Sequence, residues 1–158
     1  MEPDRRRRPA RSPFAQRMFS DVALYSIPLV LMPTPPKLRI LIADDSAPVR
    51  RGITALLLAN AGWEICGEAA DGPEALQKTV ELKPDLVLLD ISMPGISGLD
   101  AARMIRESVP GTRILIMSQH DTAHMLPGVL DAGAQGCIDK GSLSIDLFPA
   151  IESCCSQT

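Results

Sequence analysis

The sequence predicts an α/β fold in which a parallel β-sheet is covered by helices on both faces. Short runs of Val, Leu and Ile, bounded by turn residues, recur five times from Leu38 onward, and such runs are typical of buried parallel strands. Between the runs, apolar residues recur at three- and four-residue spacing, which is typical of amphipathic helices. Repeated β-α units of this kind imply parallel strands with helical crossovers.

The first repeat begins with the apolar run at residues 38–43. Ser46 can cap the helix that follows, because a serine hydroxyl accepts a hydrogen bond from a free amide of the first turn. Pro48 suits that first turn, since its missing N–H is not needed there. Apolar residues at helical spacing continue to Ala61, so we expect this helix to end at Gly62.

The second and third repeats have similar boundaries. Residues 63–69 and 86–90 are the predicted strands, and the second of them ends in Asp90. Asp71-Gly72-Pro73 opens the helix between them, and Lys83-Pro84 ends it because a residue before proline disfavours the helical conformation. A third helix is expected over residues 99–109.

The fourth strand ends at Ser118, and the helix after it is expected to reach about Ala132. Pro127 in that helix leaves two interpretations open. It lies in the first turn, where proline is tolerated, or further inside, where it removes a hydrogen bond at a cost of ~3 kcal/mol and shortens, kinks or loosens the helix. A short fifth strand precedes Lys140, and a final helix over residues 143–155 completes the fold.

Length and charge limit the class of protein. The 158 residues fit one domain, expected over residues 38–155, with an extension at 1–37 and a tail at 156–158. The extension holds seven Lys and Arg against three Asp and Glu, whereas the remainder holds nine against sixteen. An acidic domain argues against nucleic-acid binding, because phosphate backbones are bound mainly by Lys and Arg. The four cysteines show no zinc-site or disulfide pattern and indicate reduced thiols in a cytosolic protein.

The basic, proline-rich residues 1–37 superficially resemble a signal peptide, because Arg5–Arg8 precede an apolar stretch at 22–32. A polar residue and a proline interrupt that stretch, and it is too short to span a bilayer, which needs ~20 apolar residues. The remaining interpretations are a disordered extension, or translation that begins at Met32.

Polar side chains follow the predicted strands at the point where each strand ends. They are Asp44, Asp45, Asp90, Ser118 and Lys140. Open α/β sheets bind ligands outside the carboxyl ends of their strands, so we expect these side chains to meet. Taken singly, each has a plainer interpretation as a helix cap, a turn residue or a surface charge. Taken together, three carboxylates, a hydroxyl and an ammonium indicate a site that accepts a phosphoryl group.

The order of these residues resembles the receiver domain of bacterial two-component response regulators. The resemblance is carried by Asp44-Asp45, the segment Leu89–Gly98, Ser118, and the segment Ala132–Gly136 that leads to Lys140. It covers residues 38–155. It implies a flavodoxin-like (βα)5 doubly wound parallel sheet with strand order 2-1-3-4-5.

The resemblance also implies a bound Mg²⁺ as cofactor. Asp45 and Asp90 would bind the ion directly, Asp44 would act through water, and Ser92 would offer its main-chain carbonyl. This donor set agrees with the preference of Mg²⁺ for oxygen ligands, of which one or two are usually carboxylates.

In the same resemblance, Asp90 is the phosphoacceptor, because a carboxylate can attack phosphorus in line to give an acyl phosphate. Lys140 would place its ammonium on a phosphoryl oxygen. Ser118 would donate its hydroxyl to another oxygen after phosphorylation and so bias its loop. His120, two residues after Ser118, occupies a position that in this family can modulate loss of the phosphoryl group.

The implied function is phosphorelay signal transduction by a cytoplasmic, single-domain response regulator. It would accept a phosphoryl group from a histidine kinase or a histidine phosphotransfer protein and then switch, or relay to, a protein partner not yet identified. It would bind no nucleic acid through this domain and span no membrane, with homodimer formation on phosphorylation as an option. It would not be an enzyme beyond self-phosphorylation from small donors and autodephosphorylation. Because only residues 156–158 follow the last helix, we expect a stand-alone receiver.

Several alternatives stay open. Cys137 stands where receivers commonly carry Tyr or Phe, and together with Pro127 it leaves room for an interaction module that works without phosphorylation. The sequence of residues 92–99 looks most like that of receivers that precede a DNA-binding domain, which would make the chain a truncated relative. A Mg²⁺-dependent phosphohydrolase of the haloacid dehalogenase type needs a second Asp two residues after the first, where this chain has Ser92.

Overall fold

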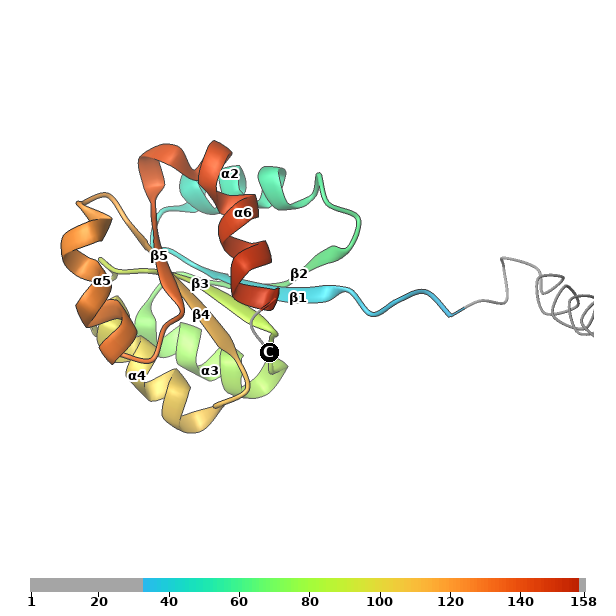
Figure 1. Cartoon of the computed structure of the whole chain (residues 1–158). Coiled ribbons are helices and arrows are strands. Elements are labelled where there is room, and N and C mark those ends of the chain that lie inside the picture. Colours follow the sequence, from blue (N-terminus) through green and yellow to red (C-terminus); the bar gives the residue numbers. More distant parts are fainter. Residues whose placement is uncertain (1–32, 157–158) are drawn as a thin grey trace, which may run out of the picture. The chain divides into compact units, whose positions relative to one another are not determined.

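A five-stranded parallel sheet forms the centre of the described part of the chain. The structure is a computed structural model that describes residues 33–156. The strands are ordered β2-β1-β3-β4-β5 (Figure 1), which confirms both the α/β class and the strand order 2-1-3-4-5. They are β1 (Leu38–Ala43), β2 (Trp63–Ala69), β3 (Leu86–Asp90), β4 (Arg113–Ser118) and β5 (Gly136–Asp139). Our predictions for residues 1–32, and for most of the tail, lie outside the described residues.

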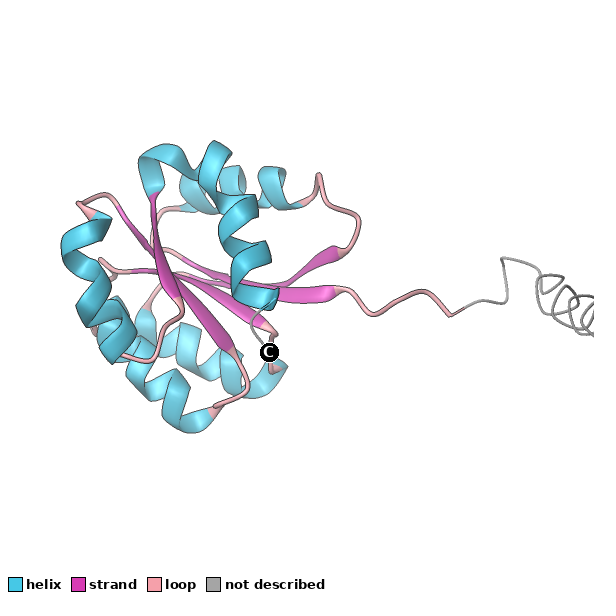
Figure 2. Cartoon of the chain, viewed as in Figure 1, coloured by secondary structure: helices cyan, strands magenta, loops and turns pink. Residues whose placement is uncertain are grey.

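Helices cover both faces of this sheet, as Figures 1 and 2 show. The helices α2 and α6 lie on one side, and α3, α4 and α5 on the other. Their bounds are α2 (Ala47–Leu57), α3 (Gly72–Leu82), α4 (Gly98–Ser108), α5 (Thr122–Asp131) and α6 (Leu143–Ser156), and a short 3₁₀ turn, η3 (Lys140–Ser142), precedes α6. Within residues 33–156, no helix combines the length and the apolar character that crossing a bilayer requires.

The central strands are apolar except near their ends, because both of their faces are buried. In β1, Leu41 and Ala43 pack into the layer formed with α3, α4 and α5, whereas Ile40 and Ile42 pack into the layer formed with α2 and α6. Side chains of successive strand residues point to opposite faces, so a strand covered on both sides has no position left for an exposed polar residue. The polar residues of these strands are therefore confined to strand ends.

The end of α2 differs from the prediction. The helix stops at Leu57, with Leu58 as its C-terminal cap, and does not continue to Gly62. The carboxamide oxygen of Asn60 accepts a hydrogen bond from the amide of Gly62 at 2.8 Å, and the Gly62 carbonyl accepts from the amide of Leu38 at 2.9 Å. The chain leaves the helix early because it must bring the start of β2 alongside β1, and helical periodicity carries no information about that pairing.

Prolines lie inside two helices. Pro127 is well past the first turn of α5, which Asp121 caps, so its placement in the first turn is wrong. Because proline has no N–H, the carbonyl of Ala123 lacks its helical hydrogen bond. Gly133 closes the segment with a φ of 89°, which glycine adopts without strain. Pro149 lies inside α6, and the sequence reasoning passed over it.

The cysteines are free thiols, as their spacing indicated. Cys154 is buried in the layer beneath α6, and burial raises the pKa of its thiol to about 11. A thiol of that pKa is almost entirely protonated at neutral pH and is therefore a poor nucleophile.

Candidate functional site

The predicted site residues come together at the carboxyl edge of the sheet. Asp44 and Asp45 follow β1, Asp90 ends β3, Ser118 ends β4, and Lys140 follows β5. Because β1 and β4 flank β3, and β5 flanks β4, the ends of these strands are neighbours. Asp44, Asp90 and Ser118 are buried, whereas Asp45 is exposed.

Lys140 links two of the carboxylates. Its Nζ atom lies 2.7 Å from Oδ2 of Asp44 and 3.0 Å from Oδ1 of Asp90, and its side chain is only 10% exposed. Burial by itself lowers the pKa of Lys140, but hydrogen bonds and charge interactions with Asp44 and Asp90 outweigh burial and raise the pKa above its ordinary value. Lys140 is therefore a permanent cation at neutral pH, held between two anions.

Asp90 is held in an environment that opposes its negative charge. Desolvation by burial raises the pKa of the Asp90 carboxyl, although hydrogen bonds from Lys140 and from the Ser92 amide act in the opposite direction. The Ser92 amide lies 3.2 Å from Oδ1 of Asp90, and the charge of Asp44 raises the pKa further. Additional positive charge at this place would favour the ionised carboxylate.

The three aspartates fit a divalent cation. Ligand oxygens of Asp44, Asp45 and Asp90 lie within 4.8 Å of one another. Oδ1 of Asp44 accepts a hydrogen bond from the Ser46 amide at 2.8 Å, and the buried Oδ2 faces the Lys140 ammonium at 2.7 Å. Hard carboxylate oxygens at this spacing are suited to an ion such as Mg²⁺ or to its water.

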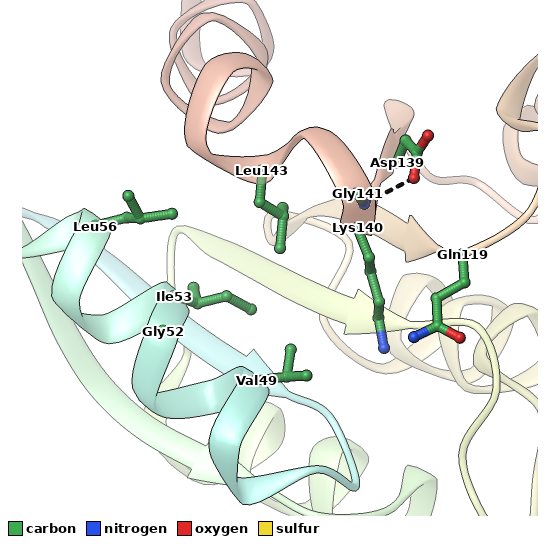
Figure 3. Close-up of a pocket in the computed structure, with 9 residues that line it drawn as sticks. All are labelled: Val49, Gly52, Ile53, Leu56, Gln119, Asp139, Lys140, Gly141 and Leu143. Atoms are coloured by element: carbon green, nitrogen blue, oxygen red, sulfur yellow. Dashed lines mark hydrogen bonds between the residues drawn. The ribbon is translucent and has the colours of Figure 1, made fainter.

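Two cavities meet at Lys140. One, of about 270 Å³, is lined by Asp45, Ser46, Val49, Asp90, Ser92, Gln119, His120 and Lys140. The other, of about 540 Å³, is mainly apolar and opens between α2 and the start of α6, where Val49, Ile53, Leu56 and Leu143 line it (Figure 3). Gln119 and Lys140 line both cavities, so an apolar surface leads directly to the charged site.

Ser118 is close to the site but its hydroxyl is engaged elsewhere. The hydroxyl donates to Sδ of Met125 at 3.2 Å and accepts from the His120 amide at 3.0 Å. Met125 is partly buried against the same apolar layer as Cys137, the residue that stands in place of the expected aromatic. The contact of Ser118 with a phosphoryl oxygen stays a prediction, and no sequence signal pointed to Met125 as its partner.

Sequence reasoning missed two further residues that shape the site. Nη1 of Arg50 donates to the main-chain carbonyl of Asp44 at 2.7 Å. A Cβ atom at Gly98 would lie 2.3 Å from the carbonyl oxygen of Asp90, so only glycine lets α4 approach the end of β3 this closely. Gly98 lies in a turn-rich loop, which was a sequence signal for this glycine. The contact of Gly98 with Asp90, however, depends on tertiary packing.

Comparisons with known proteins agree with this geometry. The sequence model of the response regulator receiver domain matches residues 40–152. The oxygen regulatory protein NreC of Staphylococcus epidermidis is 44% identical over 117 residues, which are 73% of this chain and 54% of NreC, so the chain spans about half the length of the curated relatives it matches.

Solved structures show the same fold. The signal receiver domain of the response regulator NarL from Mycobacterium tuberculosis is 32% identical, with a TM-score of 0.73 over 78% of this chain and all of that domain. A two-component response regulator of the LuxR family from Aurantimonas is 36% identical, with a TM-score of 0.71 over 74% of this chain and 84% of that one. On its fold, the match over residues 40–152 and these relatives, the chain belongs to the family of response regulator receiver domains.

Proposed function

We propose that this chain is a phosphoacceptor in two-component signalling, and that Asp90 receives a phosphoryl group from a histidine kinase or a histidine phosphotransfer protein in the cytoplasm. The observation that supports this most is the Lys140 ammonium, which lies within hydrogen-bonding distance of two buried carboxylates at the carboxyl ends of β1 and β3. A lysine so placed can neutralise charge that arrives beside Asp90.

The chemistry follows from the chain's own side chains. An oxygen of Asp90 attacks phosphorus, the bond from phosphorus to the donor atom breaks, and the electron pair of that bond leaves with the donor. Lys140 turns its ammonium toward a phosphoryl oxygen. Ser118 exchanges the sulfur of Met125 for a phosphoryl oxygen, which is a stronger acceptor.

The acidic side chains would hold the ion that this transfer needs. Asp45 and Asp90 would bind Mg²⁺ directly, with Asp44 acting through water and Ser92 through its main-chain carbonyl. When bound, the ion supplies positive charge that offsets the charge of the phosphoryl oxygens. This role agrees with the raised pKa of Asp90, because desolvation by burial outweighs the hydrogen bonds from Lys140 and from the Ser92 amide that favour the carboxylate.

The apolar cavity beside Lys140 is where we place the protein donor. A helix seated against Leu56 and Leu143 would lie next to the charged site, because Gln119 and Lys140 belong to both cavities. A Leu56→Asp variant should slow transfer from a phosphorylated protein donor at least tenfold and leave phosphorylation by acetyl phosphate unchanged. Equal loss with both donors would remove the docking role.

The response would pass to a downstream protein, or to a second copy of the chain that pairs with it on phosphorylation. The NreC relatives are longer than this chain, and one solved relative belongs to the LuxR family, so the same switch would also fit within a longer regulator of the LuxR kind. Turnover would be limited to self-phosphorylation from small donors and autodephosphorylation. A second candidate, an interaction module independent of phosphorylation, is favoured by two observations: the Ser118 hydroxyl is bound to Met125, and no aromatic residue stands at Cys137.

Intact mass spectrometry tests the proposal. The protein is incubated with acetyl phosphate or phosphoramidate, with and without Mg²⁺, beside an Asp90→Asn control. A gain of one phosphoryl group that requires Mg²⁺ and vanishes in the control is the expected result. Absence of the adduct, with small donors and with a phosphorylated histidine kinase alike, would favour the interaction module.

A further inference from the structure

Arg50, a residue of α2, contacts the main chain of the acidic pair Asp44 and Asp45. Its Nη1 atom donates to the main-chain carbonyl of Asp44 at 2.7 Å, and its side chain is 18% exposed. That carbonyl belongs to the peptide that joins Asp44 to Asp45. Because a peptide is planar, a hydrogen bond to its oxygen restricts the backbone from which both acidic side chains project.

The guanidinium is itself held from the opposite side. Its Nε is buried without a hydrogen bond of its own and lies 3.6 Å from Oε2 of Glu68, a residue of β2. The other carboxylate oxygen of Glu68 accepts a hydrogen bond from the hydroxyl of Thr54 at 3.4 Å. The planar, rigid fork of Arg50 therefore spans the space between β2 and the turn after β1, which the flexible point charge of a lysine would not do.

Charge alone does not explain an arginine at this place. A positive charge close to a cation site repels the ion, so its electrostatic effect is to weaken binding. A hydrogen bond that orients the peptide between two ligands has the opposite effect, because outer contacts of metal ligands commonly determine much of the affinity. The two explanations predict opposite signs for the same substitution.

We propose that Arg50 is a positioning residue for the divalent cation: it orients the Asp44–Asp45 peptide so that both carboxylates face Asp90. This inference rests on the proposed function, since it assumes that the three aspartates bind Mg²⁺. Arg50 touches neither the ion nor the phosphoryl group and acts through the main chain of Asp44.

Calorimetric titration of Mg²⁺ into the full chain tests the role of Arg50 without a phosphodonor. Arg50→Gln and Arg50→Lys should both weaken Mg²⁺ binding by roughly tenfold, the lower end of what outer contacts of metal ligands are worth. Arg51→Gln removes a charge from the next residue, which is exposed, and should leave the affinity within about twofold of the original. Unchanged binding in Arg50→Lys with tighter binding in Arg50→Gln would show that only charge matters and would overturn the proposal.

Glu68→Gln provides a second variant in case substitution of Arg50 unfolds the protein, which circular dichroism would detect. It leaves Arg50 in place but weakens the group that orients it, so it should lower Mg²⁺ affinity by a smaller factor. Affinity at or above the original in Glu68→Gln would contradict the positioning role. If the original protein binds no Mg²⁺ at all, the proposed function fails together with this inference, whereas normal binding in the original and in both Arg50 variants overturns the inference alone.

Discussion

Two loops border the acidic site, and they are held in very different ways. The loop between β3 and α4 is joined to β4 by a hydrogen bond from the Ile91 amide to the Met117 carbonyl at 3.0 Å, and its ends are joined by one from the Gly98 amide to the Ile91 carbonyl at 2.9 Å. The loop between β4 and α5 is held at Ser118 by a thioether and one amide. The first loop carries Asp90 and Ser92 and is a fixed frame, whereas the second can exchange its contacts at low cost.

The helices that follow the loops show the same difference. A side chain caps each helix, but four residues are buried in α4, whereas in α5 Val129 alone is buried and Pro127 interrupts the hydrogen bonding. Segments with few buried apolar contacts and broken hydrogen bonds open most easily. The part of the site that we propose accepts a phosphoryl group is thus separate from the part that would respond to it.

The largest effect is expected from Gly98→Ala, which disturbs the close packing of α4 against the end of β3. The added methyl would overlap the carbonyl of Asp90 and the Cα of Ile91, which are main-chain atoms that no rotamer change can move. We expect a loss of about 3 kcal/mol or more in the free energy of unfolding, measured by urea denaturation. Gly52→Ala is the control, because nothing lies within 4 Å of its Cβ and an alanine in a helix should stabilise by about 1 kcal/mol. Equal stability of the two variants would mean that the frame is not rigid.

Pro127→Ala should stabilise α5, the helix that follows the more weakly held loop. It restores an N–H that can bond the Ala123 carbonyl, and we expect a gain of about 1 kcal/mol, less than the ~3 kcal/mol of an isolated helix because α5 has adapted to the proline. Hydrogen exchange should slow in α5 and stay unchanged in α4. Slower exchange in both helices would show that the two sides of the site are coupled in stability.

Asp90→Asn measures how much the negative charge of Asp90 lowers the stability of the protein. Because burial raises the pKa of Asp90 above 3.8, the folded state binds its proton more tightly than the unfolded state does, so stability falls as pH rises through that window. The neutral variant should therefore be more stable at pH 7, by about 1 kcal/mol, the usual size of a single-residue effect. The difference should vanish on acidification below pH ~4, and thermal melts across pH check it. A constant difference at all pH values would point to packing instead of charge.

Met125→Leu is the smallest change and concerns the contact of Ser118. Leucine keeps the apolar volume but offers no acceptor, so the cost to stability should stay below about 1 kcal/mol. The freed hydroxyl should be available to a phosphoryl group, and phosphorylation of Asp90 by acetyl phosphate should be faster than in the original protein. A slower reaction would assign Met125 a supporting role in the site.

Much of the fold and the site could be predicted because both depend on local sequence. Strand ends, helix caps such as Asp71 and the turn at Gly133 follow from residue type, and parallel strands necessarily bring their carboxyl-end residues together. The missed features depend on contacts between elements distant in the sequence. The early end of α2 reflects the pairing of β2 with β1, and the contact of Arg50 with Asp44 depends on the angle at which α2 leaves the sheet.

One feature of the fold determines how this protein can be observed. Trp63, the sole tryptophan of the chain, begins β2 and packs against Phe148 of α6 with ring centroids 4.8 Å apart. It therefore lies at the amino end of a strand whose carboxyl end borders the acidic site. The intrinsic fluorescence of Trp63 will report the separation of α6 from the sheet on unfolding. It will change little on the proposed phosphoryl transfer. An optical signal from the site requires a fluorophore introduced near its rim.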